Sequence, residues 1–341
     1  MKAYRRQGIS LLLAVILMVL CPIQARAAQK DEKDVSGRLE ELQEESQEET
    51  GDKGSSVSEE SGAELPDQQG EVTEPITKED KPYLALGANL TPQQQKTVLE
   101  LLGIDPAELS DYDVIYITNE EEHAYLGEYV AANKIGTRAL SSVLVVKREK
   151  GNGINITTKN ISYCTIGMYK NALITAGITD ADIIVAGPSP ISGTAALVGA
   201  MKAYSVMTGD QVSEESMDTA LNELVLTGDI AEKVGDSEKA EELVAYLKQE
   251  VIEKGLDSEQ EIRSAVQEAC KQFDITLSED EITELTGLLE KIEQLDLDPD
   301  SIRNQAEELY QKLSNLDTGS IFDKVAGFFR SILDFFQGLF S

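Results

Sequence analysis

The sequence predicts an α+β protein in which a sheet domain is followed by an all-α helical region. Short apolar runs rich in β-branched residues alternate with helical stretches between residues 82 and 210. After residue 210 the strand signals stop, and charged amphipathic helices take over. We therefore divide the chain into five parts: a signal peptide (1–27), an acidic linker (28–81), an α/β domain (82–210), an acidic helical region (211–319) and an amphipathic C-terminal helix (320–341).

The first residues have the pattern of a secretory signal peptide. Basic side chains near the start precede an apolar run over residues 9–20, and Ala25-Arg26-Ala27 supplies a cleavage signal. The apolar run is too short to span a membrane. The linker that follows is rich in Glu, Gln and Ser and cannot bury enough apolar surface to fold. We therefore expect a secreted, extracellular protein, held near the cell envelope by a disordered spacer.

Charge and cysteine content limit the classes of partner. The formal net charge is -32, and residues 211–319 contribute 29 acidic against 9 basic side chains. Nucleic acid is excluded as a partner because phosphate contacts need clustered Lys and Arg. With one histidine and no C-x-x-C, we expect no metal and no other cofactor. Cys164 and Cys270 permit one disulfide, and whether they pair stays open.

The α/β domain begins with a helix and continues as alternating strands and helices. Thr91, Pro92 and Gln94 form a capping box with proline at the first helical position. The elements that follow are a strand at 114–118, a helix from Asn119 to about 133, strands at 140–147 and 154–161, a helix at 163–176, a strand from 183 and a helix at 193–207. Asn152-Gly153 indicates a hairpin between the second and third strands. Ser192 is the expected N-cap of the last helix, whose small residues permit close approach to a sheet.

The order β-α-β-β-α-β predicts a ferredoxin-like sheet with split β-α-β units. A mixed three-layer α/β sheet is the alternative. In the ferredoxin-like arrangement, residues 136–138, 162–165 and 188–194 meet at one edge of the sheet. Residues 118–123 then lie at the opposite edge.

The helical region shows clear helix starts. Ser258 and Ser278 are each followed three residues later by Glu, which is the capping-box pattern. Asp298-Pro299 also reads as a helix start. The alternative, a calcium loop, lacks its turn glycine because Ser301 stands there. An apolar stripe over residues 285–295 predicts a small helical bundle or an extended arm.

The C-terminal segment is unusually aromatic, since residues 321–340 hold six of the seven phenylalanines. Its apolar residues fall on one broad helical face. The helix either packs back on the protein's own helices, which we favour, or makes peripheral contact with a membrane or a partner.

One group of side chains suits a small anionic ligand: Thr137, Arg138, Ser141, Ser142, Ser192, Gly193 and Thr194. An arginine beside a helix N-terminus and hydroxyls fits a carboxylate or phosphate group. No general base is evident beside them, so binding is favoured over catalysis. The structural alternative is that Ser192 only caps its helix and that Arg138 bonds to loop carbonyls.

A second group has catalytic potential: Asn119, Glu120, Glu121, His123 and Cys164. Glu120 and Glu121, together with Glu122, suit acid–base chemistry or a metal. The structural alternative is that Asn119 and Glu122 form a capping box, since acidic residues favour a helix N-terminus. Cys164 near a helix start would need His123 as its base, and the expected topology separates them. An extracytoplasmic hydrolase or transferase using Cys164 or Ser192 is therefore the alternative to a binding protein.

Five segments between Leu84 and about Asp210 resemble a family of secreted Gram-positive proteins known only as domain of unknown function 1002. They are Leu86–Thr91 (LGANLT), Thr118–His123 (TNEEEH), Gly136–Ser142 (GTRALSS), Tyr163–Thr165 (YCT) and Ile191–Leu197 (ISGTAAL). The resemblance implies secretion and brings no established activity. The expected partner is an unidentified envelope component or a small anionic ligand.

Overall fold

The computed structural model describes residues 71–72, 75–130, 135–209, 211–295, 297–305 and 307, all of which belong to one compact unit. The predicted signal peptide, residues 28–70 of the linker and the C-terminal helix at 320–341 lie outside the described residues.

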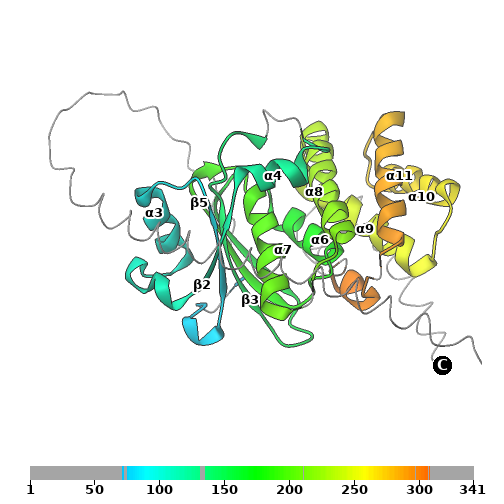
Figure 1. Cartoon of the computed structure of the whole chain (residues 1–341). Helices are drawn as coiled ribbons and strands as arrows, with labels where there is room; N and C mark the ends of the chain where they lie inside the picture. The colour runs from blue at the N-terminus through cyan, green and yellow to red at the C-terminus, as the bar shows by residue number, and fades with distance from the viewer. Residues whose placement is uncertain are drawn as a thin grey trace, which may run out of the picture. The chain divides into compact units, whose positions relative to one another are not determined.

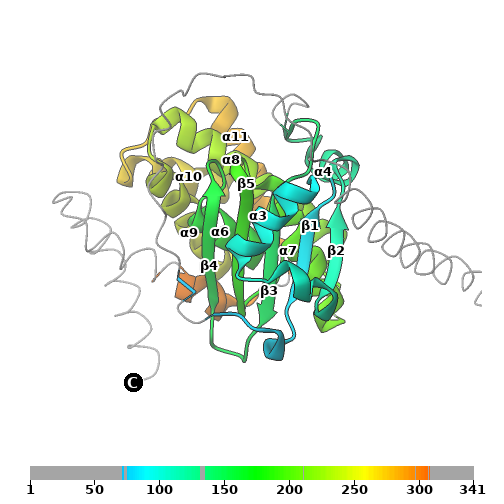
Figure 2. The same cartoon turned by 90° about the vertical axis from the view of Figure 1, so that its left-hand side faces the viewer.

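A five-stranded mixed sheet forms the centre of the fold, in the order β2-β1-β3-β5-β4. Its strands are β1 (Tyr83–Gly87), β2 (Asp113–Ile117), β3 (Ser142–Lys147), β4 (Ile154–Ile161) and β5 (Ala181–Ile191). β1 pairs in parallel with β2, and β4 with β5. The middle strand, β3, is antiparallel to both of its neighbours (Figure 2). Four strands therefore end at the edge where β3 begins.

The α+β class with a helical C-terminal region is confirmed, but the ferredoxin-like strand order is wrong. β1 was not predicted, and it lies between β2 and β3. β5 separates β3 from β4, so Asn152-Gly153 does not close a hairpin between neighbouring strands. Instead the loop crosses the start of β5, where Asp180 Oδ1 accepts hydrogen bonds from the N–H groups of Gly151 (2.8 Å) and Gly153 (3.0 Å).

Helices cover both faces of the sheet, which matches the three-layer alternative. α3 (Pro92–Leu102) lies on one face, and α6 (Ile166–Thr175) and α7 (Thr194–Thr208) lie on the other (Figure 1). Side chains alternate along the strands, so that Leu84 and Leu86 pack with α3 while Ala85 packs with α7. The small residues of α7 do allow close approach, because a Cβ added at Gly199 would lie 2.9 Å from the Cβ of Ala85.

Four long helices form the C-terminal region: α8 (Glu214–Val234), α9 (Ser237–Lys254), α10 (Glu259–Gln272) and α11 (Glu279–Glu293). The predicted N-caps Ser258 and Ser278 are confirmed, since each accepts a hydrogen bond from the backbone N–H three residues on. Asp298 also begins a helix, because its Oδ2 accepts from the N–H of Ser301 at 3.2 Å. The side chain of Asp298 is therefore used to cap a helix, as the first interpretation predicted, and the calcium-loop alternative is not supported.

A buried ion pair joins the helical region to the sheet domain. Lys248 Nζ of α9 lies 2.9 Å from Glu223 Oε1 of α8, and both side chains are fully buried. The same ammonium donates to the carbonyl of Asn171 in α6 at 2.8 Å. Burial lowers the pKa of Lys248, against the opposing effect of Glu223. Separating α9 from α8 or α6 would leave a buried charge without its partner, which is energetically costly. The contact therefore holds α8 and α9 against α6.

The folded chain starts before residue 82, inside the predicted linker. The N–H of Glu71 donates to the carbonyl of Ile156 in β4 at 3.0 Å, and its carboxylate lies 2.9 Å from Lys170 Nζ. Ile76 is buried against the α3 face. Apolar residues in this otherwise polar segment explain why its end packs on the domain.

Both cysteines of the described chain, Cys164 and Cys270, are free and buried, and they lie in separate hydrophobic clusters. Within the described residues, no helix combines the length and the apolar composition that crossing a bilayer requires.

Candidate functional site

The ends of β1, β2, β4 and β5 and the start of β3 bring five distant segments to one edge of the sheet. We call it the carboxyl edge; it comprises residues 87–91, 118–123, 136–142, 162–165 and 187–194. The prediction that 136–138, 162–165 and 188–194 share an edge agrees with this arrangement. The placement of 118–123 at the opposite edge is wrong, because β2 runs parallel to β4 and β5. All five segments that carry the family resemblance contribute residues here.

The N-terminus of α7 lies at the middle of the carboxyl edge. Its N-cap is Gly193, at φ 96°, and not Ser192 as predicted. Ser141, at the start of β3, supplies the missing cap by accepting from the N–H of Ala196 at 3.0 Å. Among the described residues, the N–H groups of Thr194 and Ala195 have no acceptor. The helix therefore presents two unbonded donors and the positive end of its dipole at this edge.

A buried carboxyl group lies directly behind this helix start. Glu122 of α4 (Asn119–Leu126) is 2% exposed, and its Oε1 accepts from Thr194 Oγ1 at 2.5 Å. When Glu122 is ionised, Thr194 uses its one proton in that bond, so Ser192 Oγ is then the donor in its 3.2 Å contact with Thr194. A hydroxyl chain thus runs from half-exposed Ser192 to a buried acid. Burial raises the pKa of Glu122, although Thr194 and Asn119 oppose the shift.

The capping box predicted between Asn119 and Glu122 is wrong. α4 is capped by Thr118, whose side chain exchanges hydrogen bonds with Glu121. Glu122 precedes buried Leu126 by four residues, so the two share the helix face that packs inward. That spacing was the signal available in the sequence.

Two of the remaining members of the second group, His123 and Asn119, contact the loop before β3. His123 Nε2 lies 2.8 Å from the carbonyl oxygen of Gly136, and Asn119 Nδ2 makes a longer 3.5 Å contact to the same oxygen. Glu121 pairs with Lys202 of α7. Glu120 is exposed. Three of these four residues therefore have structural partners, which leaves little of the predicted acid–base group available to a substrate.

Thr137 and Arg138 are exposed at the tip of this loop. Arg138 makes no hydrogen bond or ion pair with any described residue, so the alternative in which it bonds to loop carbonyls is not observed. Ser142, by contrast, is fully buried and accepts from the N–H of Gly87 at 3.1 Å. The predicted anion group therefore divides into accessible residues (Thr137, Arg138, Ser192) and a buried frame (Ser141, Ser142, Gly193, Thr194).

Cys164 belongs to the buried frame as well. It is 2% exposed, and burial raises the pKa of its thiol, against a hydrogen bond with Tyr169. The hydroxyl of Tyr169 donates a hydrogen bond to the carbonyl of Gly193 at 2.7 Å. The thiol is protonated and shielded, and among the described residues it makes no contact with His123. A nucleophilic Cys164 is not supported.

The described residues contain no group of three or more His, Cys, Asp or Glu side chains placed to hold a metal ion.

The fold is that of an α+β domain with a mixed five-stranded sheet, and the five segments that resemble a known family meet at one edge of that sheet. Comparison with known proteins gives the family. The chain belongs to the family described as "Protein of unknown function (DUF1002)", whose model matches residues 86–309. It is 34% identical over 259 residues to "Uncharacterized protein YpuA" of Bacillus subtilis (strain 168), covering 76% of this chain and 87% of that protein. No solved structure matches it.

The family match confirms the resemblance inferred from the five segments and extends it. The motifs indicated a domain that ends near Asp210, whereas the match continues through α8–α11. The buried Glu223–Lys248 pair gives a physical reason, since these helices pack on α6 as part of one compact unit.

Proposed function

We propose that this protein is a secreted binding protein of the cell envelope that holds a small anionic group at the carboxyl edge. The observation that carries the proposal is that exposed Arg138, half-exposed Ser192 and the unbonded N–H groups of Thr194 and Ala195 all belong to the carboxyl edge. Ligands of open α/β sheets bind beyond the carboxyl ends of strands, and four strands end here.

The acids nearest this group do not oppose an anion as strongly as their number suggests. The raised pKa of Glu122 favours its neutral form relative to an ordinary glutamate. Glu121 is neutralised by Lys202. A carboxylate or phosphate of an envelope component therefore meets one guanidinium, two backbone donors and a hydroxyl. For residues 320–341 the sequence favours packing on the protein's own helices, and peripheral membrane contact is the alternative.

The test is calorimetric titration of the mature chain with acetate, inorganic phosphate and carboxylate-terminated cell-wall peptides. Wild type binds at least one of them, and Arg138→Ala weakens that affinity about tenfold or more, because a charge-assisted hydrogen bond is lost. Arg263→Ala is the matched control, since Arg263 pairs with exposed Glu279 on another part of the chain. Binding that Arg138→Ala leaves unchanged would exclude this site.

The hydroxyl chain supports a second candidate, an extracytoplasmic hydrolase or transferase that uses Ser192. Ser192 would pass its proton to Thr194 as Thr194 passes its own to Glu122. A carboxyl group with a raised pKa is a better base near neutral pH than an ordinary glutamate.

Hydrolysis of an activated ester by the mature chain tests this candidate. Turnover should fall at least a hundredfold in both Ser192→Ala and Thr194→Val, because general-base assistance contributes about that much. Cys164→Ala should retain it. Turnover that survives Thr194→Val would show that the chain of hydroxyls takes no part.

A further inference from the structure

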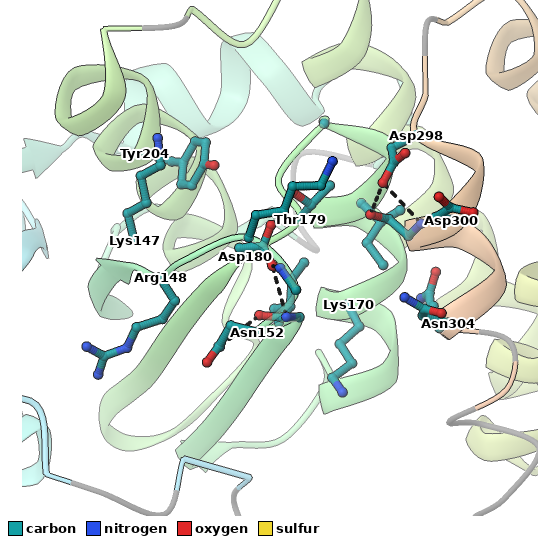
Figure 3. Close-up of a pocket in the computed structure, with 18 residues that line it drawn as sticks. Lys147, Arg148, Asn152, Lys170, Thr179, Asp180, Tyr204, Asp298, Asp300 and Asn304 are labelled. Atoms are coloured by element: carbon teal, nitrogen blue, oxygen red, sulfur yellow. Dashed lines mark hydrogen bonds between the residues drawn. The ribbon is translucent and has the colours of Figure 1, made fainter.

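A cavity of about 690 Å³ opens at the other end of the sheet, which we call the amino edge (residues 147–153 and 177–180). Its walls are the loop after β3, the end of α6, Tyr204 of α7 and residues 298–305. Figure 3 shows Lys147 and Tyr204 on one side and Asp298, Asp300 and Asn304 on the other. Cavities of this volume hold small-molecule ligands. The carboxyl-edge site shares none of these residues.

The walls of the cavity are fixed by hydrogen bonds. Asp180 holds the glycine loop through two backbone N–H groups, as described above. Residues 298–305 are tied to the rest of the unit because Gln305 bonds Asn171 and Arg303 Nε lies 2.9 Å from Glu253 Oε1. The cavity is therefore preorganised, which lowers the entropy cost of binding.

Most charges around the cavity have partners within the protein. Arg148 binds Asp80 (2.9 Å) and Asp182 (2.6 Å), and in Figure 3 its guanidinium extends away from Thr179 and Asp180. Lys170 pairs with Glu71. Asp300 pairs with Arg303 at 3.1 Å, and Asp298 caps its helix.

Lys147 and Lys150 are the exceptions. Both are exposed, and neither side chain makes a hydrogen bond or a close ion pair with a described residue, although Lys150 lies near enough to Asp298 to help lower the pKa of that carboxyl group. The whole chain has 62 acidic and 30 basic side chains, so acidic partners are abundant. Two unpaired lysines at one fixed cavity therefore favour an anionic ligand group.

The other lining groups suit hydroxyl groups and a C–H face. Asn304 makes no side-chain hydrogen bond with a described residue, so its amide offers a donor and an acceptor. Thr179 and Asn152 offer acceptor oxygens, because the Thr179 hydroxyl already donates to Asp180 at 3.0 Å and the Asn152 amide donates to the carbonyl of Gly153 at 3.1 Å. Tyr204 adds an aromatic ring. An apolar ligand is disfavoured because Ile154 and Ile174 are the large aliphatic side chains among these residues.

We propose that this cavity binds a sugar or polyol that carries one carboxylate or phosphate group. Lys147 and Lys150 bind the anionic group, while Asn304, Asn152 and Thr179 bind hydroxyl groups. Tyr204 contacts the C–H face of the ring. The proposal is independent of the carboxyl-edge site.

The test is titration of the mature protein, by calorimetry, with four probes: glucose 6-phosphate, glucuronate, glucose and inorganic phosphate. At least one of the two charged sugars should bind ten or more times as tightly as either glucose or phosphate. Lys147→Ala/Lys150→Ala should lose that affinity at least tenfold, and Asn304→Ala should lose it severalfold. Lys96→Ala/Lys271→Ala removes the same charge from α3 and α10 and should bind as wild type does.

Arg138→Ala should also bind these sugars as wild type does, which separates the two sites. Equal affinity in wild type and Lys147→Ala/Lys150→Ala would overturn the proposal, as would binding of phosphate alone. No binding of either charged sugar would overturn it too. Thermal unfolding of each variant confirms that a lost affinity is not lost folding.

Discussion

The two ends of the sheet differ in how their polar groups are used. At the carboxyl edge, a dense network of serine, threonine, tyrosine and backbone groups surrounds Glu122 and leaves few side chains exposed. At the amino edge, a glycine loop and residues 298–305 enclose an open cavity with two unpaired lysines. The comparison shows that the segments easiest to recognise in the sequence are not the ones that line this cavity of about 690 Å³.

The physical reason lies in the direction of the strands. Four strands end at the carboxyl edge, so many loops meet there and satisfy one another's hydrogen bonds. At the amino edge one loop crosses β5, and a helical segment from the end of the described chain supplies the other wall. The carboxyl edge is therefore mainly filled by packing between loops, whereas the amino edge keeps a cavity open.

Substituting a glycine at each end should give the largest contrast. Gly193 and Gly151 both have positive φ, at 96° and 95°. A Cβ at Gly193 would lie 2.4 Å from Tyr169 Oη and 2.8 Å from Ile161 Cγ2, whereas a Cβ at Gly151 meets no atom within 4 Å. Gly193→Ala should cost about 3–4 kcal/mol of unfolding free energy, and Gly151→Ala about 1–2 kcal/mol. Urea denaturation measures both, and equal losses would show that the carboxyl edge is not tightly packed.

Removing the ion-paired Arg148 should destabilise the protein more than removing Lys147 and Lys150, and this difference should be smaller than that between the two glycine variants. Arg148→Ala removes two hydrogen-bonded ion pairs and should cost about 1–2 kcal/mol. Lys147→Ala/Lys150→Ala should change stability by no more than about 0.5 kcal/mol, because neither lysine has a hydrogen bond to lose and the attraction between exposed Lys150 and Asp298 is screened by solvent. Denaturation of the two variants in parallel decides this, and a cost for the lysine variant as large as that for Arg148→Ala would mean that the lysines serve folding.

The smallest effect should appear in the pH dependence of two neighbouring glutamates. The raised pKa of Glu122 means that the folded state holds its proton longer than the unfolded state does, so this residue lowers stability as pH rises above the usual glutamate pKa of 4.5. Glu122→Gln should therefore gain stability relative to wild type above that pH and show no such gain below it.

Glu121 should behave in the opposite way. Burial raises its pKa, but Lys202 and Thr118 together hold it below the ordinary value. Its stabilising contribution is therefore present above pH 4.5 and disappears as pH falls through the folded-state pKa. Thermal unfolding of Glu121→Gln and Glu122→Gln from about pH 3 to about pH 8, which spans the usual glutamate pKa, measures both contributions. Parallel curves for the two variants would contradict the assignment of opposite environments.

Local sequence signals predicted much of the secondary structure. Helix starts such as Thr91, Ser258 and Ser278 were identified correctly, because a capping residue acts on backbone within its own turn. The short strand β1 was missed, since five residues ending in glycine carry little periodic signal. That single omission, with the misleading Asn152-Gly153 turn, was enough to give the wrong strand order.

The sequence predicted correctly that some residues of the candidate site share one edge of the sheet, but it did so from a strand order that is wrong. Arg138 and Ser192 do reach the same edge, although through a different topology. Glu122 and the amino-edge cavity were not predicted, because burial of one acid in a run of three depends on which helix face meets the sheet.

By itself the sequence determined the α+β class, the family, and the helix caps at Thr91, Ser258 and Ser278, because each depends on residues that are neighbours in the chain. Strand order, the buried state of Glu122 and the fixed cavity beside Lys147 and Lys150 were decided only by tertiary structure. These features depend on contacts between residues far apart in the chain, and the free energy of such contacts has no counterpart in any local pattern.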